Sequence, residues 1–444
     1  MKRVLPLVFC LAALLLAACA PAAGTAPVST AVAVPQPRPT LVLPATYTPR
    51  PTPTAAVTAT AAATAIPSPT VTPFPTGCQA AGALLPSPDP NIPAVSAADF
   101  TLGPANAAVT FMEYADFQCP YCAQLDPVLK KLLAAYPVDV RLVFRFFPLD
   151  GHDKALVSAQ VAQAAGLQGK FWEMHDLLFN TLAVWGTMTP NDFLTWATAQ
   201  AATLGLDSKK LAADAVSPDV VNQVQNDQIA ANAIGIPGTP YMLANGLSIG
   251  SNVDETTLTF VVDLIKKLAA LEPKRVKDCP PVTIDQTKQY LATLNTTKGD
   301  VVIQLFPDKA PLAVNSFVFL ARRGWYDGVP FRRVIADFVA QTGDPTGTGQ
   351  GNPGYFFVNE INADLKFDKA GVVAMANSGP NSNGSQFFIT YAAQPHLDGG
   401  YTIFGQVTQG MDVVQKLTQI DPSAANGTPL PEPDKIIKVT IEVK

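Results

Sequence analysis

The chain has few charged residues, only three histidines and no extended basic segment. Charged side chains make up 15% of its 444 residues, and the formal net charge is −5. Clustered lysine and arginine bind nucleic acids and anionic lipid surfaces, so this composition argues against both. His152, His175 and His396 are scattered. A structural zinc site needs four ligands, and the chain has a single CxxC motif, so we expect no metal.

Apolar runs long enough to span a bilayer are also absent. The run from Val4 to Ala18 is shorter than the ~20 residues of a spanning helix, and it follows Lys2 and Arg3. This pattern is typical of a secretory signal peptide, here residues 1–18. The ending Leu-Ala-Ala-Cys resembles the lipobox of bacterial lipoproteins, which implies that Cys19 carries lipid and anchors the chain to a membrane. An ordinary signal peptide cleaved nearby is the alternative.

Proline is abundant, and much of it lies near the N-terminus. Residues 20–76 consist mainly of Ala, Pro, Thr and Val. Proline blocks the hydrogen bonds of helices and sheets, so this composition predicts an extended stalk without a packed core. We assign residues 19–84 to it.

Six cysteines are present, and each has an expected role. Cys10 leaves with the signal peptide, and Cys119 and Cys122 form the CxxC motif. The remaining pair, Cys78 and Cys279, flanks the middle of the chain. In an oxidising compartment such a pair usually forms a structural disulfide. Two free thiols are the alternative.

In the middle region, a strand pattern at 109–114 is followed by the CxxC motif and then by apolar residues at helical spacing. The motif therefore lies at a helix start, where unpaired N–H groups stabilise a thiolate. We expect Cys119 to be the exposed, attacking thiol. Cys122, one turn further, is placed to resolve a mixed disulfide.

Later residues of this region resemble the DsbA-like branch of the thioredoxin superfamily. The sequence Gly-Ile-Pro-Gly-Thr-Pro-Tyr precedes a strand at 242–244, and a helix-rich stretch covers 153–233. The resemblance implies an α/β thioredoxin-like fold with a helical insertion over 85–275. It also implies that the Thr239–Pro240 bond is cis and faces the CxxC motif, where it contacts substrate. Tyr121 stands where strongly oxidising members have His, so the direction of thiol exchange stays open.

The C-terminal region contains Phe-Arg-Arg-Val-Ile at 331–335, Phe-Val-Ala-Gln at 338–341, Met-Ala-Asn at 375–377 and Gly-Ser-Gln-Phe-Phe at 384–388. These segments resemble the cyclophilin family of peptidyl-prolyl isomerases. The resemblance implies a closed β-barrel over 290–444, joined to the middle domain by a linker over 276–289. Short apolar runs separated by glycine-rich turns agree with a barrel.

The resemblance also assigns roles to residues. Arg333 and Gln341 are the expected catalytic pair, and the permanently charged guanidinium is suited to binding the prolyl nitrogen. The expected substrate-binding residues are Phe331, Phe338, Val339, Gly347, Ala376, Asn377, Ser378, Gln386, Phe388, His396, Leu397 and Tyr401. The glycine-rich segment at 347–351 lacks the following helix of a dinucleotide loop, and we expect no cofactor.

Together these features predict a lipid-anchored, extracytoplasmic protein-folding catalyst. It would combine prolyl isomerisation with thiol–disulfide exchange. Its expected partners are unfolded or partly folded secreted polypeptides and a redox partner protein at the membrane. Two alternatives remain open: a peptide-binding holdase or scaffold, and a dedicated redox carrier.

Overall fold

The computed structural model describes residues 77–423 and 430–444. The expected signal peptide, the Cys19 lipidation site and residues 19–76 of the expected stalk lie outside the described residues. In the part of the chain that is described, no helix is long and apolar enough to cross a bilayer.

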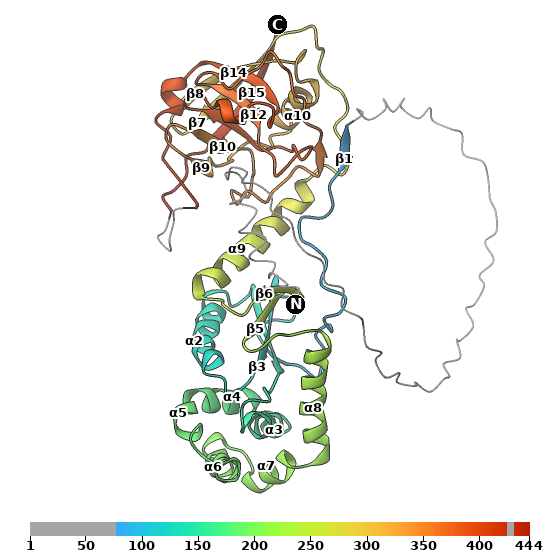
Figure 1. The fold of residues 1–444 in the computed structure, drawn as a ribbon, viewed down its shortest axis with the longest axis vertical. Coiled ribbons are helices and arrows are strands. Elements are labelled where there is room, and N and C mark those ends of the chain that lie inside the picture. Colours follow the sequence, from blue (N-terminus) through green and yellow to red (C-terminus); the bar gives the residue numbers. More distant parts are fainter. Residues whose placement is uncertain (1–76, 424–429) are drawn as a thin grey trace, which may run out of the picture. The chain divides into compact units, whose positions relative to one another are not determined.

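The first domain is built on a five-stranded sheet with the order β2-β4-β3-β5-β6, of which Figure 1 labels β3, β5 and β6. Its strands are β2 (Phe100–Leu102), β3 (Val109–Ala115), β4 (Val140–Phe146), β5 (Tyr241–Ala244) and β6 (Leu247–Gly250). Strands β3 and β4 run parallel, and the other neighbours are antiparallel.

Both faces of this sheet are covered, which explains why β3 is apolar on both sides. Phe111 packs with α2 (Pro120–Ala135) and α9 (Glu255–Leu271) on one face. Its neighbour Met112 points to the other face and packs in a cluster that includes Ala231 of α8 (Pro218–Ala233). The alternation of side chains along a strand produces this division.

The expected helical insertion lies between β4 and β5. It consists of α3 (Ala155–Gly166), α4 (Phe171–Asn180), α5 (Leu182–Trp185), α6 (Pro190–Ala201), η1 (Ala202–Leu204), α7 (Ser208–Ala215) and α8. Three of these helices begin at side-chain caps, because Thr189, Asp207 and Ser217 each accept a backbone N–H of the first turn.

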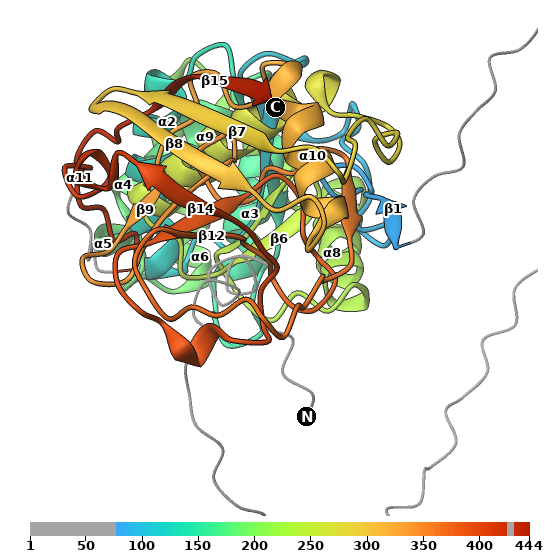
Figure 2. The ribbon, with the colours of Figure 1, turned by 90° about the horizontal axis from the view of Figure 1, so that it is seen from above.

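The second domain is an eight-stranded antiparallel sheet curved into a half-barrel, with the order β15-β7-β8-β14-β12-β13-β10-β9. Its strands are β7 (Tyr290–Thr296), β8 (Gly299–Leu305), β9 (Arg333–Val334), β10 (Val339–Thr342), β12 (Val372–Met375), β13 (Phe387–Thr390), β14 (Ile403–Gln409) and β15 (Ile436–Val443). The domain also contains α10 (Pro311–Arg322), η3 (Pro395–Leu397) and α11 (Met411–Val414). Figure 2 shows β8 between β7 and β14, with α10 nearby.

The strand ladder of this domain is not continuous around the barrel. Between β9 and β15 the edges are joined by the segment that precedes β9. Phe331 donates its N–H to the Asp434 carbonyl at 2.8 Å, and Ile436 donates to the Val329 carbonyl at 2.8 Å. A short irregular contact thus takes the place of the fully closed ladder expected from the sequence.

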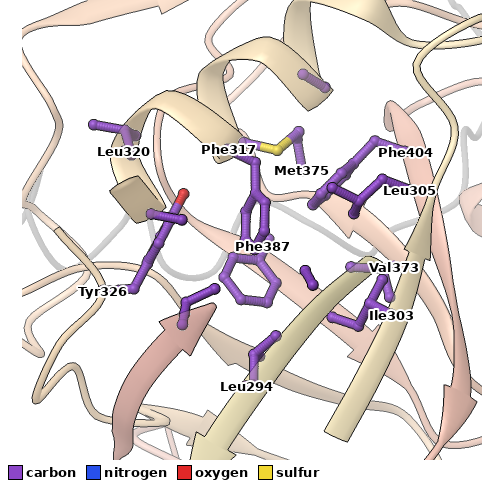
Figure 3. Close-up of a cluster of buried hydrophobic side chains, with 14 of the residues drawn as sticks. Leu294, Ile303, Leu305, Phe317, Leu320, Tyr326, Val373, Met375, Phe387 and Phe404 are labelled. Atoms are coloured by element: carbon purple, nitrogen blue, oxygen red, sulfur yellow. The ribbon is translucent and has the colours of Figure 1, made fainter. Parts of the chain in front are cut away.

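The core of the second domain lies between its sheet and α10. Phe317 of α10 stacks on Tyr326 at 5.0 Å and meets Phe387 edge-on at 5.4 Å, and Phe404 completes the aromatic group (Figure 3). These four side chains are fully buried. Aromatic packing of this kind adds to the free energy gained from burial alone.

Two segments assigned to the stalk and the linker belong to the second domain instead. Residues 78–80 form β1 (Cys78–Ala80), which pairs antiparallel with β11 (Tyr355–Phe357). A disulfide joins Cys78 to Cys279, and Cys279 is buried in the core of this domain. The extended stalk therefore does not reach residue 84. Composition could not indicate this, because the partner strand lies far along the chain.

Candidate active sites

The CxxC motif lies at the junction of β3 and α2, as its spacing predicted. Cys119 is the N-cap of α2, and Pro120 occupies the first turn, where its missing N–H costs nothing. The expected exposure of Cys119 is wrong: its exposed fraction is 3%, and that of Cys122 is 0%. Tyr121 between them is 67% exposed, so it is the residue of the motif that lies at the protein surface.

Cys119 is buried beneath the segment that contains Thr239 and Pro240, which lies far along the chain. The Thr239–Pro240 peptide bond is cis, and the Cys119 thiol donates to the Thr239 carbonyl at 3.4 Å. The structure thus brings together the four residues that the resemblance placed at the thiol site.

Hydrogen bonds strongly favour the thiolate of Cys119. Its pKa falls to about 6, chiefly because the Cys122 side chain donates to it. The backbone N–H groups of Tyr121 and Cys122 act in the same direction, against the effect of burial, and so does the nearby Thr239 hydroxyl, although it forms no geometrically complete hydrogen bond among the described residues. Since thiolates attack disulfides, Cys119 is reactive near neutral pH.

Glu113 is a buried carboxyl group that acts electrostatically on the thiol pair, and the sequence pattern alone did not single it out. Its carboxyl group lies on β3 and is 2% exposed, and its Oε1 atom has no hydrogen-bond partner among the described residues. Burial raises its pKa to about 8, with smaller contributions from the charges of Asp126 and Cys119. Burial also raises the pKa of the Cys122 thiol, and the Glu113 charge adds to this effect. The ionised form, which is the minor one below a pH of about 8, can accept the proton that Cys122 must lose.

Three side chains in the same domain have the spacing of metal ligands, but a lysine ammonium group lies between two of them. The ligand atoms of Asp126, His175 and Asp176 lie within 4.8 Å of one another. Lys130 Nζ contacts the Asp126 carboxylate at 2.8 Å and the Asp176 carboxylate at 2.9 Å. The His175 Nδ1 atom is also bonded to Asp176. We therefore assign this group a structural role.

In the second domain, strand register brings the two expected catalytic residues together. Gln341 of β10 lies opposite Arg333 of β9 and opposite Phe388 of β13. The Arg333 guanidinium lies 5.2 Å from the centre of the Phe338 ring and forms no ion pair or hydrogen bond with any described residue. Its N–H groups are therefore available to a ligand.

Apolar side chains form a patch beside this pair. Val339 and Phe388 are buried, and they pack in one cluster with partly buried Phe338, Leu397 and Tyr401. The Tyr401 ring meets Phe388 edge-on at 5.4 Å. His396 stacks on Phe338 at 5.9 Å. The expected proline-binding residues therefore share one surface region.

A cleft of about 320 Å³ is lined by Gln341, Ala376, Asn377, Ser378, Gln386 and Arg332, among others. Gln386 organises its wall. Its side-chain amide donates to the carbonyls of Gly349 and Gly351 at 2.9 and 3.2 Å and accepts from Gln341 at 3.1 Å. The backbone carbonyl of Gln386 also accepts the Ala376 N–H.

Two expected substrate-binding residues lie elsewhere. Phe331 is 1% exposed and packs in the main core, where it fills space at the irregular closure of the barrel. Gly347 does not line the cleft. A Cβ atom there would lie 2.8 Å from the Pro330 ring, and its φ of +69° is left-handed, so glycine is required by the loop itself. Gly349 and Gly351 line the cleft instead.

Comparison with known proteins agrees with this geometry. The family described as cyclophilin type peptidyl-prolyl cis-trans isomerase/CLD matches residues 291–441. Peptidyl-prolyl cis-trans isomerase-like 1 of Rhizopus delemar is 53% identical over 127 residues, which cover 28% of this chain and 77% of that protein. The chain belongs to the cyclophilin family. Peptidyl-prolyl cis-trans isomerase cypE of Dictyostelium discoideum is 48% identical over 155 residues, or 34% of this chain and 97% of that protein.

The family described as thioredoxin matches residues 96–263. Among solved structures, a thioredoxin-like oxidoreductase from Silicibacter pomeroyi has 29% sequence identity and a TM-score of 0.33, and the match covers 39% of this chain and 94% of that chain. In this cyclophilin, the C-terminal prolyl isomerase domain thus follows a thioredoxin-like domain.

The low pKa of Cys119 can be measured directly. In the reduced protein, the rate of alkylation of Cys119 should rise with pH to a midpoint near 6. In Cys122→Ala the midpoint should move up toward the usual value of about 8.5, because the principal hydrogen-bond donor is lost. Mass spectrometry of quenched samples identifies the modified thiol. A wild-type midpoint above 8 would contradict the assignment.

Glu113→Gln should separate stability from activity. At pH 7 the folded protein keeps a proton on Glu113 that the unfolded chain has released, so ionisation opposes folding increasingly as pH rises from 4.5 toward about 8. We expect the variant to be more stable than the wild type by about 2–3 kcal/mol at pH 7 and by much less at pH 4.

The same variant should resolve a mixed disulfide at Cys119 more slowly, by roughly tenfold or more at pH 7, because the proton acceptor is gone. Urea denaturation of the reduced protein at both pH values and stopped-flow kinetics provide the measurements. Glu255→Gln, at an exposed carboxylate of α9, is the matched control. Equal stability gains at pH 4 and pH 7 would refute the role of Glu113.

Proposed function

We propose that the chain is an extracytoplasmic folding catalyst that acts on secreted polypeptides through both of its domains. The observation that carries the proposal is the juxtaposition of Arg333 and Gln341 beside an apolar patch. An arginine without a carboxylate partner, next to apolar surface, suits a reaction in which no bond to a heavy atom is broken. Rotation about an X–Pro peptide bond is such a reaction.

The barrier to that rotation is ~18–20 kcal/mol and arises from the partial double bond between carbon and nitrogen. In the proposed mechanism, the apolar patch of Phe338, Val339, Phe388 and Leu397 holds the proline ring. Arg333 then donates to the prolyl nitrogen, withdraws its lone pair from resonance and lowers the barrier. Gln341 contacts the carbonyl group of the rotating bond.

In the thioredoxin-like domain, the Cys119 thiolate attacks a disulfide of the client. One client sulfur bonds to Cys119, and the other leaves as a thiolate that takes up a proton. Cys122 passes its own proton to ionised Glu113 and attacks the Cys119 sulfur, which breaks the bond to the client and releases the second client sulfur as a thiolate that takes up a proton. The Cys119–Cys122 pair is thereby oxidised and the client is reduced to a dithiol. The reverse sequence of steps would instead oxidise the client.

The proposed location rests on the sequence of residues 1–19 and on the Cys78–Cys279 disulfide, since structural disulfides persist mainly in oxidising compartments. There the lipid on Cys19 would anchor the catalyst, and a redox partner at the membrane would recycle the Cys119–Cys122 pair. The clients would be unfolded or partly folded secreted chains with both proline and cysteine.

We expect the native protein to fractionate with membranes and to carry a lipid on an N-terminal Cys19. Cys19→Ala should remain unlipidated and appear in the soluble extracytoplasmic fraction or as uncleaved precursor. Mass spectrometry of the N-terminal peptide and fractionation with antibody detection measure both. A mature N-terminus beyond residue 19 would exclude the lipid anchor.

Arg333→Ala should lower kcat/KM for isomerisation of a proline tetrapeptide by about 10²-fold, the scale found when a donor to a reacting group is removed. Arg322→Ala, at the exposed end of α10, is the control for loss of an arginine from this domain. A coupled-protease or NMR exchange assay measures the rate, and circular dichroism confirms the fold. Equal rates in Arg333→Ala and wild type would exclude Arg333 as the catalytic group.

A further inference from the structure

The residue beside the catalytic arginine has a different environment. Arg332 precedes β9, and its side chain lies against the glycine-rich wall of the cleft. A Cβ atom at Gly349 would lie only 2.6 Å from Arg332 Cζ. Glycine at this position therefore leaves room for the guanidinium group. Arg332 also lines the cleft that contains Gln341, Asn377 and Gln386.

The Arg332 guanidinium has no partner in the described part of the chain. Its Nε atom is buried without a hydrogen bond, and the negative charge of Asp344 acts on the group without a direct ion pair among the described residues. A nearby acid, Asp344, is fully engaged. Its carboxylate accepts from the Thr346 N–H and hydroxyl at 2.8 and 2.7 Å, and from the N–H groups of Gly349 and Gly351 at 2.6 and 3.2 Å.

No carboxylate lines the cleft among the residues that the structure describes, and Arg332 is the only charged residue there. A cation largely withdrawn from water and left unpaired is unfavourable, and it gains strongly from a bound anion. The planar fork of N–H groups fits a carboxylate in particular. Gln341 and Gln386 are uncharged, and the negative charge of nearby Asp344 offsets the cost of burial only in part, so the pKa of Arg332 stays below its usual value.

We propose that Arg332 makes this cleft a subsite for an acidic side chain of the client peptide. The isomerase domain would then prefer X–Pro bonds that have Glu or Asp at the position reaching the cleft, and it would disfavour Lys or Arg there. This inference rests on the proposed isomerase function of the same domain. It assigns a specificity that Arg333 and the proline-binding patch do not supply.

The test uses the full chain and a set of proline peptides in which a single Glu is placed in turn at each of three positions on either side of the X–Pro bond. Each Glu peptide is paired with the corresponding Gln peptide. At pH 7.5 one position should show a kcat/KM at least about tenfold higher for Glu than for Gln, as a charge-assisted hydrogen bond implies. Equilibrium binding of the same pairs, by fluorescence anisotropy, provides a measurement independent of turnover.

In Arg332→Gln, the kcat/KM for the Glu peptide should be close to that for the Gln peptide. In Arg332→Glu, the kcat/KM should be higher for a Lys peptide than for the Glu peptide. Arg322→Gln should leave the ratio unchanged. Wild-type ratios near one at every position, in both turnover and binding, would overturn the acidic subsite while isomerisation itself persists. If no peptide is isomerised, the proposed function fails, and the binding ratio alone decides the subsite.

Discussion

The isomerase cleft depends on one buried carboxylate. Asp344 is 1% exposed and holds the loop from Thr346 to Gly351 through its backbone N–H groups. That loop presents the carbonyls of Gly349 and Gly351 to Gln386, which in turn bonds to Gln341. Without Asp344, these backbone donors would be buried and unsatisfied, and the wall would lose its shape. Strand register sets Gln341 opposite Arg333, and the orientation of the Gln341 side-chain amide depends on an acid that does not line the cleft.

The connection from the thioredoxin-like domain is tied to the same region. Arg275 donates to the Asn352 side chain at 2.8 Å and to the Gly82 carbonyl at 2.7 Å, and it forms an ion pair with Glu272 at 2.7 Å. Val276 donates to the Pro353 carbonyl at 2.7 Å. Together with the Cys78–Cys279 disulfide, these bonds attach the segments on both sides of the thioredoxin-like domain to the isomerase domain. The linker expected at 276–289 is therefore part of a packed structure.

The sequence predicted the features that depend on local pattern. A strand period followed by a helical period placed the CxxC motif at a helix start, and the motif at 331–341 placed Arg333 near Gln341. The family resemblance placed Thr239 at the CxxC motif, and the leftover cysteines suggested the Cys78–Cys279 pair. Neither indicated that Thr239, 120 positions along the chain, would bury the Cys119 thiol. The pairing of β1 with β11 likewise depends on a partner that no local signal identifies.

Glu113 and Arg332 were missed for a different reason, because each lay inside a pattern that had another explanation. Glu113 stands in an apolar run and was treated as part of a buried strand, although a carboxylate in such a run is itself a signal. Arg332 stands next to Arg333 in the motif, and the family resemblance assigns a role to Arg333 alone. Arg332 precedes β9 and Arg333 begins it, so these adjacent side chains have different surroundings and can serve different purposes.

Both sites contain buried polar atoms that have no hydrogen-bond partner among the described residues. Six such atoms occur among the described residues, and three of them belong to Glu113, Thr239 and Arg332. Each unsatisfied group lowers stability, so folded proteins usually contain few of them. Glu113 and Thr239 lie at the thiol pair, where a proton acceptor and a donor to the thiolate are needed. Arg332 lies in the isomerase cleft, where an unpaired cation needs a ligand. Both domains thus retain unpaired polar groups where a substrate or a proton would complete them.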